Sequence, residues 1–149
     1  MVNVKEVPAD VLIQNLASEL KSMKVEEPEW TKYLKDGIGK EKSWTQEDWY
    51  YTRMASILRK IYINGSLGIS RMSQEYGSRQ DRGSKRYHPV QSSRYIIRSM
   101  FHALESLGYL KTIKTGREIT PKGQAFLDKA SREAMKALSE KDKSFEKYL

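Results

Sequence analysis

A helix predicted over residues 46–63 carries basic and aromatic side chains on a face that core packing does not explain. At 100° per residue, that face presents Trp49, Arg53, Arg59 and Lys60. Guanidinium groups form paired hydrogen bonds with phosphate oxygens, and an indole offers a flat surface for a base or a sugar. The residue types on this face therefore predict a contact with nucleic acid.

A structural role for the same side chains is the alternative. The indole could be covered by the segment around Trp30 or Trp44, and the arginines could pair with acids such as Glu47. Helical spacing defines which side chains share a face but not what covers them. The sequence leaves both interpretations open.

A polar loop predicted over residues 78–91 supplies a second group of candidate contacts. Gly83 and Pro89 interrupt regular structure there. Five residues able to contact a phosphate or a base lie within nine positions: Arg79, Arg82, Lys85, Arg86 and Tyr87. Charged runs are commonly just solvated surface, but bases exceed acids so clearly here that we favour nucleic acid.

Most of the net charge lies in one short region. The whole chain carries +8. Residues 71–98 contain seven basic and two acidic residues, a net charge of +5. We add Arg94 from this region as a candidate nucleic-acid contact, together with Lys40 and Lys42 at the tip of a predicted loop.

Catalysis finds little support. The chain has no cysteine and two histidines, His88 and His102, without a partner at ligand spacing. It contains no glycine-rich phosphate loop, His-Glu-x-x-His sequence or serine elbow. We therefore predict that the protein is not an enzyme and uses no cofactor, metal or small-molecule substrate.

The elements that position these residues follow from apolar periodicity and end signals. Helices are predicted at about 10–24, 46–63, 70–76, 92–107 and 121–145, and a β-hairpin at 109–113 and 117–120. Thr120 is expected to cap the last helix, with Pro121 in its first turn. Only the charged tail, residues 141–149, is expected to be loose.

Helix, short helix, helix and hairpin together predict a mainly α fold with a winged helix-turn-helix core and a short β-hairpin wing. The expected organisation is a single domain over residues 1–149. Its core is placed at about 46–120, and flanking helices at about 10–24 and 121–145 pack around it. A chain of 17.3 kDa can bury such a core without disulfides.

Composition also bounds the location of the protein. No apolar run of about 18 residues could span a bilayer. The first residues lack the basic flank and apolar stretch of a signal peptide. We predict a cytoplasmic protein without membrane contact.

The predicted second helix closely resembles the most recognisable segment of protein nineteen-e of the archaeal and eukaryotic small ribosomal subunit. That family's pattern is matched by Asp48, Trp49, Tyr50, Tyr51, Arg53, Ala55, Ser56, Arg59 and Tyr62. The resemblance continues in Pro28-Glu29-Trp30, Tyr76-Gly77-Ser78-Arg79, Leu104-Glu105-x-Leu107 and Thr120-Pro121-x-Gly123. It therefore covers nearly the whole chain, and the compactness of the chain with its modest tail favours an archaeal member.

The resemblance implies a structural protein in the head of the small subunit, bound to ribosomal RNA and neighbouring ribosomal proteins. In eukaryotic members it also implies a role in subunit assembly and RNA maturation. In the family, the Tyr-Gly-Gly-Arg segment and the loop after it face ribosomal RNA. Arg98 matches a basic position of the family's helix, so the resemblance implies that Arg98 is an RNA contact. Ser78 replaces the second glycine of that segment, which leaves the direction of Arg79 open.

Two other functions fit the same elements. A winged-helix DNA-binding transcription regulator would place the helix 92–107 in a major groove. Residues 95–107 have no net charge, which disfavours such a reader. A protein-interaction module that docks an acidic partner through the wing and the last helix is the other alternative.

Overall fold

The computed structural model describes residues 3–148, most of them helical. The α-helices are α1 (Ala9–Ser22), α2 (Trp49–Asn64), α3 (Ile69–Glu75), α4 (Arg94–Ser106) and α5 (Pro121–Lys141). The strands are β1 (Ser66–Leu67), β2 (Ser78–Arg82), β3 (Lys85–Val90), β4 (Leu110–Ile113) and β5 (Gly116–Ile119). Two short 3₁₀ helices, η1 (Glu29–Lys32) and η2 (Lys143–Tyr148), complete the chain.

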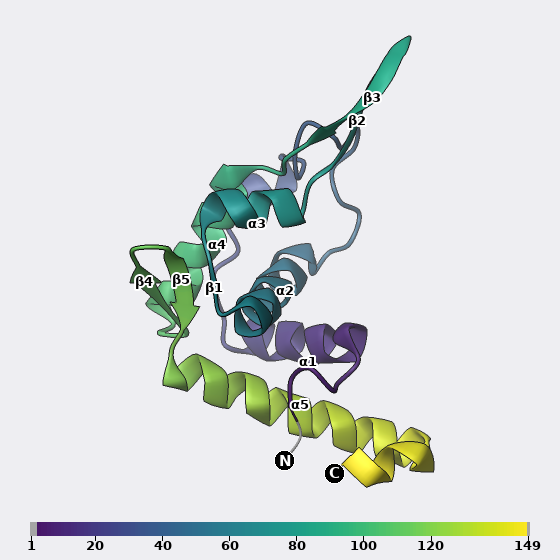
Figure 1. The fold of residues 1–149 in the computed structure, drawn as a ribbon, viewed down its shortest axis with the longest axis vertical. Helices are drawn as coiled ribbons and strands as arrows, with labels where there is room; N and C mark the ends of the chain where they lie inside the picture. The colour runs from purple at the N-terminus through teal and green to yellow at the C-terminus, as the bar shows by residue number, and fades with distance from the viewer. Residues whose placement is uncertain (1–2, 149) are drawn as a thin grey trace.

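Helices α2, α3 and α4 are followed by the β4–β5 hairpin, which is the order of a winged helix (Figure 1). β5 lies between β4 and β1 in a three-stranded antiparallel sheet, with Ser66 opposite Glu118 and Leu110 opposite Ile119. Strand β1 has two residues, too few for an alternating pattern, and was not predicted. The predicted mainly α fold with a hairpin wing is confirmed.

The two flanking helices lie together on one side of the winged helix. Figure 1 shows α1 between α2 and α5, and the helices of both pairs are in contact. Fully buried apolar side chains join the layers: Leu12, Leu16, Leu20, Met54, Leu58, Ile61 and Leu127. None of the described helices is long and apolar enough to cross a membrane.

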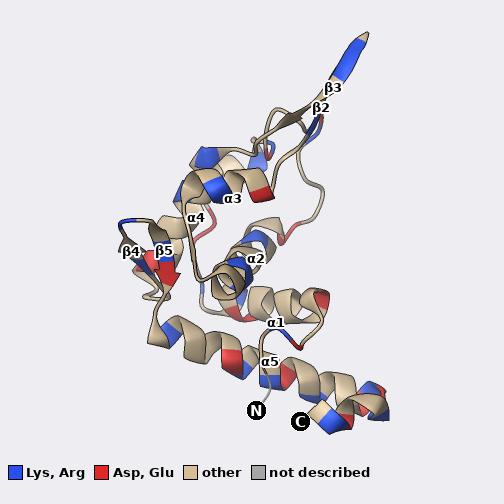
Figure 2. Ribbon diagram, in the orientation of Figure 1, with Lys and Arg blue, Asp and Glu red and all other residues tan. Residues whose placement is uncertain are grey.

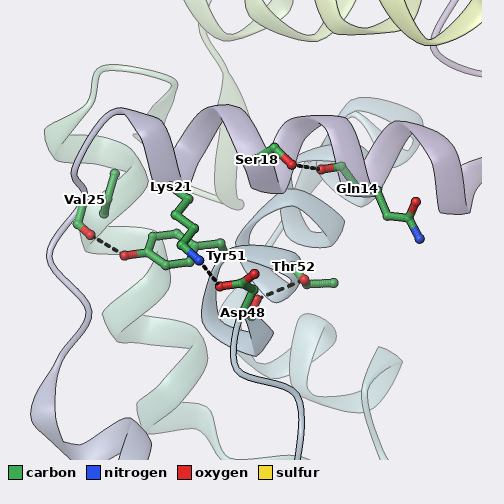
Figure 3. Close-up of polar contacts among 7 residues, drawn as sticks. All are labelled: Gln14, Ser18, Lys21, Val25, Asp48, Tyr51 and Thr52. Atoms are coloured by element: carbon green, nitrogen blue, oxygen red, sulfur yellow. Dashed lines mark hydrogen bonds and ion pairs between the residues drawn. The ribbon is translucent and has the colours of Figure 1, made fainter. Parts of the chain in front are cut away.

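Polar contacts connect the end of α1 to the start of α2 (Figure 3). The Tyr51 hydroxyl donates a hydrogen bond of 2.7 Å to the carbonyl of Val25. The Lys21 ammonium lies 2.6 Å from Asp48 Oδ1. The Asp48 carbonyl also accepts a bond of 2.9 Å from the Thr52 hydroxyl, beside the helical bond that it accepts from the Thr52 amide.

The start of α5 confirms the predicted cap. Thr120 Oγ1 accepts a hydrogen bond of 3.2 Å from the Gly123 amide and donates one of 2.6 Å to the carbonyl of Gly108. Gly123 is buried against the wing, where an added Cβ would lie 2.5 Å from the carbonyl oxygen of Tyr109. The Thr-Pro-x-Gly sequence therefore both begins α5 and allows its close approach to the wing.

Two local predictions were wrong. Residues 78–91, predicted as a loop, form the antiparallel β2–β3 hairpin over most of their length. Backbone hydrogen bonds build this ladder, and its mostly exposed, polar side chains leave no alternating apolar pattern to read. The tail, predicted to be loose, is ordered as far as Tyr148, because η2 places Phe145 against the core. Leu149 lies outside the described residues.

Candidate nucleic-acid interface

Arg53 on α2 is held inside the molecule by an acid from a distant segment. Its two terminal nitrogens donate hydrogen bonds of 3.1 Å each to the two carboxylate oxygens of Asp36. The two side chains are only 14% and 9% exposed. The guanidinium carbon also lies 4.0 Å from the centre of the Tyr76 ring and 5.0 Å from that of Trp49. The structure therefore gives Arg53 a scaffolding position, with Asp36 rather than Glu47 as its acid.

The structural alternative for the Trp49 indole, cover by another tryptophan segment, is also observed. Trp49 stacks on Trp44, with ring centroids 3.7 Å apart and planes 3° from parallel. Both rings remain half-buried. The Trp44 segment thus covers one face of the Trp49 indole, as the alternative interpretation required.

The other two α2 cations differ in what the protein offers them. Lys60 pairs with Glu75 at 3.2 Å, and its ammonium lies 4.5 Å from the centre of the Tyr76 ring. Arg59 is half-buried, and its buried Nε has no hydrogen-bond partner within residues 3–148. The Tyr76 hydroxyl in turn donates a bond of 2.7 Å to Ser56 Oγ, and burial raises the pKa of this tyrosine. This part of α2 is mainly a polar layer that joins α2 to α3.

The β2–β3 hairpin presents its cations differently. It projects away from the helices, and its basic residues gather toward its outer end (Figure 2). Arg79, Lys85 and Arg86 are exposed and form no ion pair among the described residues. Arg82 donates hydrogen bonds of 2.9 and 2.7 Å to the carbonyl oxygen of Arg86 across the hairpin. That bond stiffens the tip without neutralising the charge of Arg82.

The register of the hairpin distributes these cations over both of its faces. Arg79 lies opposite Pro89 and Gln80 opposite His88, and the ladder shifts by one residue before Arg82 pairs with Lys85. Because side chains alternate along a strand, Tyr87 shares a face with Pro89, and Arg86 shares the other with His88. A ribbon of this kind can meet two phosphate backbones at once.

The base of the hairpin is tied to the helices. The Ser92 amide donates to the carbonyl of Ser73 at 3.0 Å, and the Ser93 amide donates to the carbonyl of Asp36 at 2.7 Å. Ser78 begins β2 opposite Val90, in extended backbone that does not need a glycine. With Ser78 in place of the family's second glycine, Arg79 therefore lies on a regular strand and is exposed to solvent.

Helix α4 and the segment before α2 add further open cations beside the hairpin base. Arg94, Arg98, Lys40 and Lys42 are exposed and without an ion pair in the described part of the chain. Arg71 on α3 is similarly exposed and was not selected from the sequence, although it belongs to the same basic region. A backbone bridge between Gly37 and Ser92 brings the lysine segment to the hairpin.

The described residues contain no group of three or more histidine, aspartate or glutamate side chains placed to hold a metal ion. The Glu105 carboxylate beside His102 is already paired with Arg117 at 2.9 Å and accepts a hydrogen bond of 2.8 Å from the Thr112 hydroxyl. The geometry is that of a cationic surface.

Comparison with known proteins gives a consistent result. The family model described as ribosomal protein S19e matches residues 3–137. The chain is 54% identical to small ribosomal subunit protein eS19 of Thermoplasma acidophilum, over the full length of both chains. It is 40% identical to the protein of the same name of Aeropyrum pernix, again over both full lengths. Small ribosomal subunit protein eS19B of Drosophila melanogaster is 38% identical over 86% of this chain and 84% of its own length.

Proposed function

The chain belongs to the ribosomal protein S19e family, and from this premise we propose that it binds ribosomal RNA in the head of the small subunit. Its structural place in the cytoplasmic small subunit follows from the family, as does the absence of an enzymatic role. The high identity to Thermoplasma relatives favours an archaeal member.

The projecting β2–β3 hairpin is the observation that carries RNA binding. The hairpin contains four basic residues and one acid, Asp81. The Asp81 carboxylate accepts a hydrogen bond from the Gly83 amide at the tip. Arginine and lysine that lack internal partners keep their full attraction for phosphate. A two-sided cationic ribbon suits the space between two RNA helices, where it would recognise shape and backbone rather than sequence.

The cations at the hairpin base extend the same contact. Arg94 and Arg98 on α4 would hold the RNA that approaches the foot of the hairpin. We assign Lys60 a secondary part, since it already pairs with Glu75, and Arg53 the task of holding the interface together. Arg59, whose buried Nε has no hydrogen-bond partner within residues 3–148, stays a candidate contact.

A protein that holds two RNA segments at once stabilises their folded arrangement. On this basis we include assistance to small-subunit assembly and RNA maturation in the proposed function, with neighbouring ribosomal proteins as further partners. We also propose that residues 46–120 and the two flanking helices form a single domain. Contacts of α1 with both α2 and α5 support it.

The test is to replace Arg79, Lys85 and Arg86 by Ala together and to measure affinity for a small-subunit ribosomal RNA transcript at several salt concentrations. Each lost phosphate contact should reduce the slope of log affinity against log salt by about 0.7 to 0.9. The matched control replaces Arg132, Lys136 and Lys141 on α5, which are also exposed. Equal losses in both variants would leave the hairpin without a specific role, and unchanged binding in the hairpin variant would refute its part in the interface.

Association with the subunit is measured separately on a sucrose gradient. Wild-type protein should sediment with the small subunit after a moderate salt wash. The hairpin variant should move toward the top of the gradient at lower salt than wild type.

A further inference from the structure

The stacked tryptophans Trp44 and Trp49 form one wall of a cavity beside the interface. The cavity has a volume of about 340 Å³ and opens in the segment that precedes α2. Its lining combines the two indoles with cations, hydroxyl groups and one carboxylate: Asp36, Lys40, Lys42, Ser43, Trp44, Thr45, Trp49 and Arg53. Aromatic, cationic and hydroxyl groups in one small cavity are the groups that bind a nucleotide.

The two indoles differ in what else they touch. Trp49 contacts Trp44 and also has the Arg53 guanidinium over its ring at 5.0 Å. Within residues 3–148, Trp44 has no stacking partner other than Trp49, and no cation lies over its ring. Trp44 is half-buried and packs against the core, and one face of its ring has no aromatic or cationic partner within the described residues. We take that face as the candidate stacking surface.

The charges around the cavity favour an anionic ligand. Arg53 already neutralises Asp36. Lys40 and Lys42 are exposed and form no ion pair in the described chain, and Glu41 between them is also exposed. The rim therefore retains a net positive charge, whereas Lys60 elsewhere on this side is paired with Glu75.

We propose that this cavity binds one unpaired nucleotide of RNA, with its base stacked on Trp44 and its phosphate held by Lys40 or Lys42. The inference rests on the proposed RNA-binding function and adds to it a specific subsite. Small-molecule sites begin at about 300 Å³, so a cavity of this size suits a single base and sugar rather than a helix or a strand. In this arrangement the Arg53–Asp36 pair is a positioning device, because it holds the Trp44 segment against α2.

Three variants distinguish stacking of a base from packing of the protein. Trp44→Leu fills space without offering a ring, Trp44→Phe keeps a ring, and Lys40→Ala with Lys42→Ala removes the phosphate contact. With a small-subunit ribosomal RNA transcript, Trp44→Leu should bind about tenfold more weakly than wild type, and Trp44→Phe within about threefold of it. The double lysine variant should lose affinity and salt dependence, in contrast to a Lys136→Ala, Lys141→Ala control.

Fluorescence supplies a second readout. In a Trp30→Phe background only Trp44 and Trp49 emit, and RNA should quench their emission if a base stacks on Trp44. Thermal unfolding of each variant shows whether the fold is retained. The expected result is lost affinity and lost quenching in Trp44→Leu at a temperature where it is folded.

The proposal is overturned if Trp44→Leu binds RNA as wild type does, or if Trp44→Phe loses as much affinity as Trp44→Leu. It is also overturned if RNA binds without quenching. In each of these cases a hairpin-dependent affinity would persist and the RNA-binding function would stand. If the wild-type protein has no affinity for the transcript, the proposed function itself fails, and the nucleotide subsite falls with it.

Discussion

Arg53 and Asp36 form two parallel hydrogen bonds of 3.1 Å, which join α2 to a segment 17 residues earlier in the chain. Both side chains are largely withdrawn from solvent. The Asp36 carbonyl also accepts from the Ser93 amide at the start of α4. One acid therefore connects three parts of the proposed interface.

Replacing Arg53 by Ala should lower the free energy of unfolding by about 3 kcal/mol or more, because a buried carboxylate would lose its partner. Denaturant unfolding measures the effect, and Arg71→Ala should stay within about 0.5 kcal/mol of wild type. If Arg53→Ala instead kept its stability and lost affinity for RNA, Arg53 would be a direct contact and not a scaffold.

Replacing Gly123 by Ala should destabilise the protein by about 1 to 3 kcal/mol, the usual cost of overpacking a tight site. The new Cβ would lie 2.5 Å from the Tyr109 carbonyl oxygen, and backbone cannot move away as a side chain can. Thermal unfolding checks the result, with Gln124→Ala at the next, exposed position as the control. Unchanged stability in Gly123→Ala would show that α5 can shift away from the wing.

The free energy of unfolding should fall in acid, partly because the Glu105 carboxylate becomes protonated. Burial acts to raise the pKa of this carboxyl, but hydrogen bonds from Thr112 and Arg117, with the charge of Arg117 and a contact from His102, together lower it below 4.5. A depressed pKa contributes stability above the unfolded-state value, and that contribution is lost as the pH falls through the folded-state value.

Glu105→Gln should therefore be less stable than wild type at neutral pH and should approach it between about pH 5 and pH 3. Denaturant unfolding across this range compares the two proteins. A constant difference at every pH would mean that ionisation of Glu105 does not contribute.

Replacing both Arg94 and Arg98 by Ala should weaken RNA binding at nearly unchanged stability, since both side chains are exposed and unpaired in the described structure. The loss should be smaller at high salt, where released counterions contribute less. Affinity measured at two salt concentrations tests the expectation. A loss that does not vary with salt would indicate a changed fold of α4 rather than lost phosphate contacts.

The helices were the part of the fold that the sequence predicted best. Apolar spacing placed all five helices, and Thr120 with Pro121 marked the start of α5, because both signals act within a few residues along the chain. The β2–β3 hairpin was missed for the opposite reason. Its strands are held by backbone hydrogen bonds between exposed residues, which leave no apolar alternation to detect.

The sequence by itself determined the helical elements, the wing, the basic region and the family. Only the tertiary structure decided which cations are exposed and unpaired. Arg53 and Arg79 have the same side chain, yet one is paired with Asp36 inside the molecule and the other stands exposed on a projecting strand. The difference depends on which distant segment folds against each residue, and a periodic pattern, which reports only the face of a local element, does not contain that information.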